Sequence, residues 1–224
     1  MKVKFNRRLE DYNYIISFDL AKHKTGYSLV DFKNKTIPVS GMIITEETEM
    51  PWEDFYSQLE ARVGEIVKDF GSSFFVLKER LPNQAGPRST IAALQGLAMA
   101  HAIFNLFVAQ HGLDYYDWEG VHSISVKSYY KNLTGLQKPQ KIDIFRATKE
   151  LYPRWEVPED NELSYDISDS IAVAQTLLGK KWNADINEEI RALNKEIKAA
   201  KSPKKIQRLQ EEVNRLKNLK IEEG

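Results

Sequence analysis

The sequence predicts an α/β fold: a mixed sheet of five strands, flanked by helices and followed by a helical hairpin. Three observations lead to this prediction. Three short β-like runs lie close together before residue 46, apolar runs then alternate with amphipathic stretches, and the last forty residues carry a helical repeat. The expected order before the hairpin is β-β-β-α-β-α-β-α, which is typical of a sheet covered by helices.

The first three strands are expected at residues 14–20, 26–32 and 39–45. Their connections are too short for a parallel return, which needs about a dozen residues, so the three strands should form an antiparallel meander. Residues 73–77 are continuously apolar, as expected of a central buried strand, and residues 121–126 are expected to form a fifth strand.

Amphipathic and apolar stretches predict the helices. Pro51 begins a stretch with an apolar stripe that ends at Gly71. Ser89 and Thr90 are expected to cap a long apolar helix that runs to about residue 109. Shorter helices are expected at 127–133, 140–151 and 166–179.

The C-terminal repeat predicts an antiparallel helical hairpin. Lys201-Ser-Pro-Lys204 supplies a helix stop, a Ser N-cap and a Pro at the first helical position. We therefore expect two domains, at residues 1–180 and 183–224. The apolar seam of the hairpin should be formed by Ile186, Ile190, Leu193, Ile197, Ile206, Leu209, Val213 and Leu216.

The composition is that of an ordinary globular protein of 224 residues without cysteine, which excludes disulfides, thiolate zinc sites and cysteine nucleophiles. A reducing cytoplasm is the expected compartment. No signal peptide and no run of 18 or more consecutive apolar residues is apparent, so no membrane partner is expected. The net charge is zero, but residues 46–69 carry eight acidic and two basic residues, whereas residues 121–154 carry seven basic and two acidic ones. This segregation favours one face that meets phosphate.

Four carboxylates lie where three predicted elements begin or end. Asp19 ends the first strand, Glu79 follows the fourth, and Asp166 and Asp169 are three residues apart at the start of a helix. Four such groups in one place repel each other unless a cation joins them. Oxygen ligands favour Mg²⁺ or Mn²⁺ over zinc, and two such ions form the site used to cut phosphodiesters. Taken singly, Asp19 could be a turn former and Asp166 a helix N-cap. Asp11, Asp31 and Asp143 are weaker candidates to substitute for one of these ligands, because Asp11 precedes the first strand, Asp31 lies on the second, and Asp143 lies in an amphipathic basic helix.

A family resemblance rests on four segments in order. They are Ile16-Ser-Phe-Asp19 with Thr25-Gly-Tyr-Ser28, then Val76-Leu-Lys-Glu79 with the Gln95-Gly96 helix, then the basic stretch from Ser125-Val-Lys127 through Thr134-Gly135 to Lys141, and finally Asp166-Ile-Ser-Asp169-Ser-Ile-Ala-Val-Ala174. Over about residues 12–180 the chain resembles the RuvC-like Holliday-junction resolvases of the RNase H-like superfamily, and within them most the phage-encoded members.

The resemblance implies that Asp19, Glu79, Asp166 and Asp169 bind Mg²⁺, for which Mn²⁺ could substitute, and that Lys127 and Lys141 are catalytic-site lysines that bind phosphate. Lys138 competes with Lys141 because the spacing after Gly135 is ambiguous. Further DNA contacts are expected from Lys131, Arg80 and Arg88. The loop that begins at Arg80 offers only Leu81 as an apolar wedge, which departs from relatives that insert an aromatic side chain. The chain is also less basic than is usual in the family, and the hairpin lies outside the resemblance.

The implied function is that of a homodimeric endonuclease that cuts Holliday junctions or other branched DNA, in the host cytoplasm if the protein is phage-encoded. Two alternatives stay open, namely another RNase H-like nuclease that cuts RNA–DNA hybrids or flaps, and an inactive DNA-binding or assembly module. The helix at 89–109 is either the dimer interface or simple core, and Tyr129, Tyr130 and Trp155 either stack on bases or belong to the core. The hairpin could pack in a dimer, bind a protein or extend the DNA surface.

Overall fold

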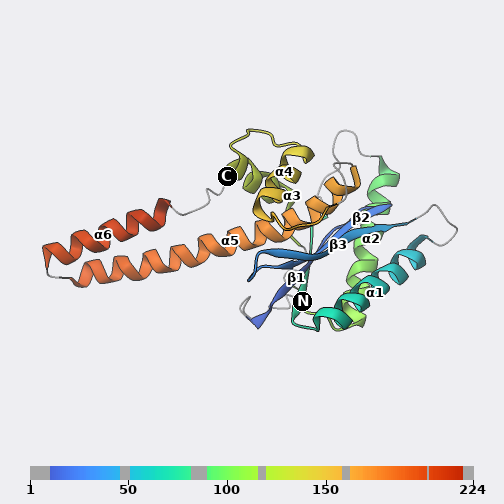
Figure 1. The fold of residues 1–224 in the computed structure, drawn as a ribbon, viewed down its shortest axis with the longest axis horizontal. Helices are drawn as coiled ribbons and strands as arrows, with labels where there is room; N and C mark the ends of the chain where they lie inside the picture. The colour runs from blue at the N-terminus through green and yellow to red at the C-terminus, as the bar shows by residue number, and fades with distance from the viewer. Residues whose placement is uncertain are drawn as a thin grey trace.

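A four-stranded sheet with the order β3-β2-β1-β4 forms the centre of the protein (Figure 1). The computed structural model describes residues 11–45, 51–81, 90–115, 120–157, 162–200 and 202–218. The strands are β1 (Tyr14–Asp19), β2 (Lys24–Asp31), β3 (Thr36–Ile44) and β4 (Phe74–Lys78). β1, β2 and β3 pair antiparallel, which confirms the predicted meander, and β4 joins the other edge of β1 in parallel.

The expected fifth strand at 121–126 is wrong. Val121 forms only an isolated parallel bridge with Glu79, and a helix begins two residues later at Ser123. Tyr115 forms a second isolated bridge, with Val76. In the residues that the structure describes, the position beside β4 therefore holds two short bridges in place of a strand. The sequence here also fits a helix, because Val126 shares a buried side with Tyr129 and Tyr130, three and four residues further on.

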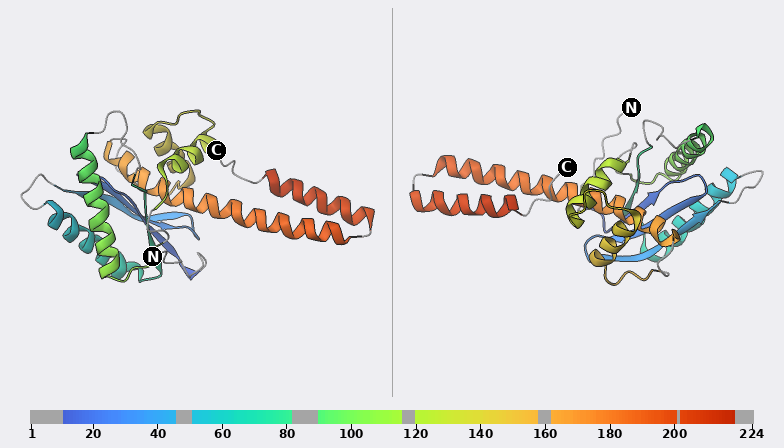
Figure 2. Two further views of the ribbon diagram at one scale, coloured as in Figure 1. Left: turned by 180° about the vertical axis from the view of Figure 1, so that it is seen from behind. Right: turned by 90° about the horizontal axis from the view of Figure 1, so that it is seen from above.

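Helices cover both faces of the sheet (Figure 2). α1 (Pro51–Phe70) and α2 (Ile91–Gln110) pack on the face to which Ile16, Phe18 and Val76 point. α3 (Ser123–Thr134), α4 (Lys141–Leu151) and α5 (Glu162–Ala199) pack on the opposite face, with Ile15 and Phe75. Because successive strand residues face opposite sides, residues 15, 17 and 19 of β1 point toward α5.

The long apolar helix α2 has the predicted start, since the Thr90 side chain accepts a hydrogen bond from the Ala93 N–H. One side of α2 packs in the core through Phe104 and Phe107, but the other exposes Met99 and Leu106. α2 is the one described helix whose length and hydropathy would suffice to cross a membrane, a test that core helices of soluble proteins also pass. Its sequence is interrupted by Gln95, His101 and Asn105, so it is not a run of consecutive apolar residues.

The three aromatic residues considered for base stacking are core residues. Tyr130 is fully buried and its hydroxyl pairs with Thr148 Oγ1 at 2.9 Å, while the Tyr129 hydroxyl accepts a hydrogen bond from Gln175 Nε2. Trp155 is buried and donates from Nε1 to Ser40 Oγ at 3.0 Å. Together, these three side chains connect α3 and α4 to α5 and to the sheet.

α5 continues far beyond the sheet and pairs with α6 (Pro203–Asn218), which runs back along it as an arm that projects from the body (Figures 1 and 2). Pro203 is the first helical residue, as predicted. The seam includes Ile190, Leu193, Ile197 and Val213, whereas Ile186 and Leu216 lie outside the described side chains. α5 runs without a break through residues 180–183, so the boundary expected there falls inside one helix.

Candidate active site

Asp19 and Glu79 meet at one end of the sheet because β1 and β4 are parallel neighbours. Asp19 is the last residue of β1, and Glu79 follows the last residue of β4. The Glu79 N–H donates to the Phe18 carbonyl at 3.1 Å, so the two strands end at the same level. Strand alternation turns both side chains toward α5. The pairing of β1 with β4 therefore places Asp19 and Glu79 side by side.

The backbone around Glu79 is held on both sides. The Val121 N–H donates to the Lys78 carbonyl at 2.9 Å, and the Arg80 N–H donates to the Val121 carbonyl at 2.7 Å. Gly120 makes this possible, since its φ is 86° and a Cβ there would lie 3.2 Å from the Arg80 nitrogen and overlap the Lys78 carbonyl oxygen. The chain beside β4 therefore fixes the position of Glu79.

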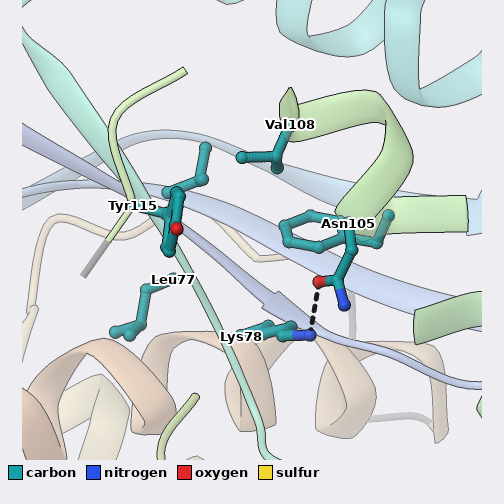
Figure 3. Close-up of a pocket in the computed structure, with 7 residues that line it drawn as sticks. Leu77, Lys78, Asn105, Val108 and Tyr115 are labelled. Carbon is teal, nitrogen blue, oxygen red and sulfur yellow. Dashed lines mark hydrogen bonds between the residues drawn. The ribbon is translucent and has the colours of Figure 1, made fainter. Parts of the chain in front are cut away.

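Lys78 anchors the same strand end to α2 from the opposite face. Its side chain is buried, and Nζ donates to Asn105 Oδ1 at 2.6 Å beside a cavity of about 10 Å³, large enough for about one water (Figure 3). Burial, reinforced by the charge of Lys78, lowers the pKa of His101 to about 4, so His101 is neutral at physiological pH. This support could not be predicted from the sequence, because Lys78 and Asn105 are far apart in the chain.

α5 approaches the sheet closely at Gly26, which pairs with Asp19 in the β1–β2 ladder. A Cβ at Gly26 would overlap the Asp166 carbonyl oxygen and lie 2.8 Å from its carbonyl carbon. Two residues further along β2, Ser28 Oγ accepts a hydrogen bond from Ser170 Oγ at 3.0 Å. Small residues thus let the α5 backbone lie against β2 and bring Asp166 beside Asp19.

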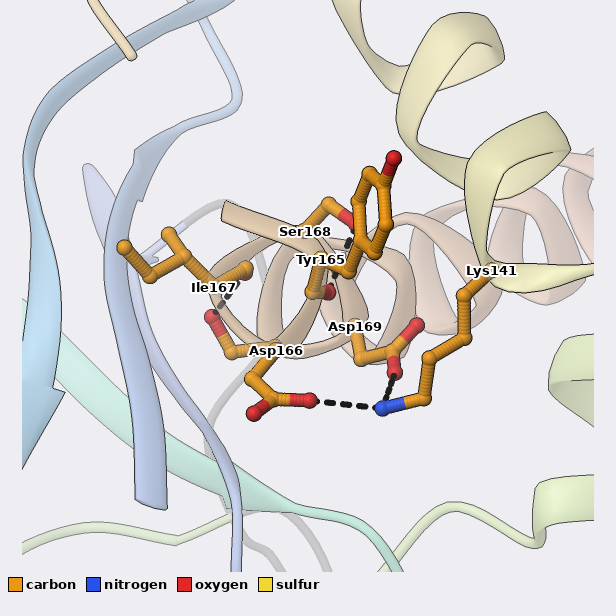
Figure 4. A network of polar contacts seen from close by, with 7 residues as sticks. Lys141, Tyr165, Asp166, Ile167, Ser168 and Asp169 are labelled. Atoms are coloured by element: carbon orange, nitrogen blue, oxygen red, sulfur yellow. Dashed lines mark hydrogen bonds and ion pairs between the residues drawn. The ribbon is translucent and has the colours of Figure 1, made fainter. Parts of the chain in front are cut away.

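Asp166 is not the N-cap of its helix. α5 begins at Glu162, so Asp166 lies one turn inside the helix and Asp169 lies on the next turn. Both carboxylates contact one ammonium group: Lys141 Nζ is 2.6 Å from Asp166 Oδ1 and 3.2 Å from Asp169 Oδ2 (Figure 4). Lys141 is the first residue of α4. Of the two competing lysines, the structure therefore brings Lys141, and not Lys138, to the carboxylates.

The four carboxylates affect one another's protonation. Burial, followed by the charge of Glu79 and a hydrogen bond with it, raises the pKa of Asp19 well above its usual value. Burial also raises the pKa of Glu79, although the hydrogen bond with Asp19 opposes the shift. Burial and the charge of Asp19 raise the pKa of Asp169 to about 7, while Lys141 lowers it. Crowded carboxylates of this kind hold protons that a cation would displace.

The donor set fits hard divalent cations, because it consists of four carboxylate side chains that come from three parts of the fold. Among the residues that the structure describes, no group of three or more such side chains is close enough to hold an ion as it stands. The reason is visible in the contacts, because Lys141 occupies the position between Asp166 and Asp169 and Asp19 bonds to Glu79. Ligation of an ion therefore requires these side chains to leave their present contacts.

The remaining predicted site residues lie around this cluster at different distances. Lys127 is exposed on α3, and its charge lowers the pKa of Glu79. Lys131 lies one turn further along α3, and Lys138 is exposed in the loop before α4. Arg80 and the half-buried Leu81 follow Glu79 directly, and Arg88 lies outside the described residues.

Two acidic residues considered as substitutes for these ligands have structural roles. Asp31 is at the opposite end of β2 from the site and accepts hydrogen bonds from the backbone N–H groups of Lys33 and Asn34. Asp143 accepts a hydrogen bond from the Gln140 N–H at the start of α4. Asp11, the third, is exposed and precedes β1.

No protein-family model and no curated protein sequence matches this chain. Among solved structures, it is similar to RuvC from Thermus thermophilus in complex with a Holliday junction substrate, with a TM-score of 0.55 and 18% identity over 74% of this chain and 92% of that one. A second Thermus thermophilus RuvC structure matches with a TM-score of 0.53 and 18% identity over 73% of this chain and 92% of that one. The chain therefore has a RuvC-like fold.

Proposed function

We propose that this protein is a magnesium-dependent, structure-selective DNA endonuclease that cuts Holliday junctions or other branched DNA. The observation that carries the proposal is the convergence of Asp19, Glu79, Asp166 and Asp169 on one end of the sheet, with raised pKa values at three of them. The similar RuvC structure was solved with a Holliday junction substrate, which favours branched DNA over other phosphodiesters.

Each residue has a distinct part in the proposed reaction. Asp19, Glu79, Asp166 and Asp169 would hold the cations, which when bound polarise the scissile phosphate and activate the attacking water. Asp19 interacts electrostatically with both Glu79 and Asp166 and so would hold the cations together with them. Lys141 would be available to phosphoryl oxygens if cations took its place beside Asp166 and Asp169, and Lys127, whose charge acts on Glu79, would contact the same backbone.

Symmetric cutting of a four-way junction requires two active sites, so we propose a homodimer. The outer side of α2 is the candidate interface, because the helix contains no charged residue and leaves Ile91, Met99 and Leu106 exposed. An apolar surface of this kind is expected to be covered by a partner.

A substrate panel tests the proposal. Wild-type protein with Mg²⁺ should cut a synthetic four-way junction by paired, symmetric nicks, in preference to duplex, flap and RNA–DNA hybrid. Asp169→Asn should lose this cleavage, while Asp69→Asn, an exposed acid near the end of α1, should keep it. Persistent cleavage by Asp169→Asn would show that the assigned site is wrong, and equal cutting of all substrates would leave only a general nuclease.

A second candidate is a catalytically inactive DNA-binding module. It is favoured by the position of Lys141, whose ammonium already neutralises Asp166 and Asp169 as a cation would. An inactive module should bind the junction with the same affinity in Mg²⁺ and in EDTA and cut none of the substrates in the panel.

A further inference from the structure

The distal half of the helical hairpin carries a concentrated positive charge. Residues 191–210, called the hairpin tip below, contain seven basic residues and one acidic residue, Glu196, in a chain of zero net charge. Six of the basic side chains are exposed, and none of these forms an ion pair with another described residue. They are Arg191, Lys195, Lys198, Lys204, Lys205 and Arg208.

The placement of two of these charges costs the hairpin local stability. Lys204 and Lys205 lie in the first turn of α6, which contains no acidic residue. The positive end of the helix dipole favours acidic groups there and disfavours cations. Lys204, Lys205 and Arg208 line a groove of about 530 Å³ together with Leu209 and Glu212. An anion bound at these side chains would reduce the repulsion of both lysines, Lys204 and Lys205, by the positive end of the helix.

The apolar side of the hairpin is already used. Ile190, Leu193, Ile197 and Val213 pack between α5 and α6, and no described hairpin residue is an exposed large hydrophobic side chain. A protein partner usually needs such an apolar centre. A surface on which exposed cations outnumber acidic side chains suits a regular row of phosphates instead.

We propose that the hairpin tip binds the phosphate backbone of a duplex arm of the DNA substrate, at a distance from the cutting site. This inference rests on the proposed function. At about 1.5 Å per residue, α5 carries Lys198 about 44 Å from Asp169, more than one turn of B-DNA, which is about 34–36 Å. The tip therefore contacts DNA only when an arm is long enough to reach it.

The test compares junctions with short and long arms. The triple variant Lys204→Ala, Lys205→Ala, Arg208→Ala is measured against Asn194→Ala, Gln210→Ala, a matched control with exposed neutral residues of the same tip. Wild-type affinity should rise when the arms are lengthened from about 8 to about 20 base pairs, and the triple variant should lose about 10- to 100-fold on long arms, with a salt slope smaller by about 2–3. Circular dichroism should show that both variants keep their helix content.

Three results are decisive. Loss of the long-arm gain in the triple variant alone supports the inference. Unchanged arm-length dependence and salt slope in the triple variant, with an active wild type, overturn it and make an acidic protein surface the partner to seek. A wild type that neither binds nor cuts any junction overturns the proposed function itself, and this inference with it.

Discussion

The backbone of Asp166 lies directly against Gly26, so closely that a single methyl group at Gly26 would overlap the Asp166 carbonyl oxygen. Gly26 also pairs with Asp19 across the β1–β2 ladder. One residue without a side chain therefore sets how near α5 comes to β1, and with it how near two of the candidate ligands lie to each other.

Gly26→Ala should both destabilise the protein and impair the site. Over-packing against backbone costs about 1–3 kcal/mol, and each kcal/mol lowers the melting temperature of a chain of this size by roughly 2–4 °C. Cleavage should fall further than stability explains, because α5 must move away from Asp19. Gly64→Ala is the control, since a Cβ there meets nothing within 4 Å. It should be neutral or slightly stabilising in thermal unfolding, and equal losses in the two variants would contradict the close approach at Gly26.

Asp169 should make the metal-free protein less stable as the pH rises. Its folded pKa is about 7 against a usual value of 3.8. Between these pH values the folded protein keeps a proton that the unfolded chain has lost, so the free energy of unfolding falls with pH, by at most about 1.4 kcal/mol per pH unit for each such group.

In EDTA, Asp169→Asn should reduce this slope and exceed the stability of the wild type at pH 8. Thermal unfolding from pH 4 to 8 measures the effect, and Asp69→Asn should keep the wild-type slope. Parallel curves for the wild type and Asp169→Asn would show that Asp169 titrates normally.

Lys141→Met should move metal binding to higher pH. Lys141 lowers the pKa of Asp169 and of Asp19, so its loss leaves both carboxyls protonated over a wider range, and protonated carboxyls do not ligate Mg²⁺. The acidic limb of Mg²⁺ affinity, followed by calorimetry, should shift upward. Lys138→Met should leave the pH dependence of Mg²⁺ affinity unchanged. The same shift in both variants would show that Lys141 does not act on the carboxylates in preference to Lys138.

Tyr130→Phe should cost stability without affecting DNA binding. The Tyr130 hydroxyl bonds to Thr148 Oγ1 in the core, and its loss leaves a buried hydroxyl unpaired, at a cost of about 1–3 kcal/mol. Urea unfolding measures the loss and junction affinity provides the second measurement. A fall in junction affinity larger than the fall in the folded fraction would show that Tyr130 stacks on bases of the DNA.

Leu106→Glu should convert the proposed dimer to monomers. Leu106 is 51% exposed on the uncharged helix α2, so a carboxylate is tolerated in a monomer but disfavoured in an apolar interface. Light scattering after gel filtration gives the mass. Val67→Glu, at a 38% exposed apolar position on α1, should keep the wild-type mass. A wild type that is monomeric at all concentrations would refute the homodimer.

The elements that the sequence predicted well are those with a strong period or a clear end signal. The short apolar run of β1 and the Thr90 cap of α2 are local features, and the structure has both. Residues 121–126 were wrongly predicted as a strand because a pattern of six residues is too short to distinguish a strand from the first turns of a helix. Asp166 resembled an N-cap because the sequence signals of a helix start specify residue types but not which of several such residues begins the helix. The helix begins four residues earlier, at Glu162.

The candidate carboxylates were predictable because Asp19 and Glu79 lie at strand ends and Asp166 and Asp169 lie near the start of a helix, and elements of an α/β fold end at shared edges. Their partners were not. The contact of Lys141 with Asp166 and Asp169 depends on how a loop after Gly135 closes, and the support of Glu79 by Lys78 and Asn105 depends on two elements packing across the sheet. Such contacts follow from tertiary packing, which a single sequence does not specify.

Because α5 is one helix from Asp169 to the hairpin, the direction in which the hairpin points is fixed by counting residues. Each residue added or removed between them would turn the hairpin about 100° around the helix axis and shift it about 1.5 Å. The arm can therefore be lengthened or shortened without turning away only in steps near whole turns, such as 7 or 11 residues. The length of the arm and the direction in which it points therefore cannot be changed independently.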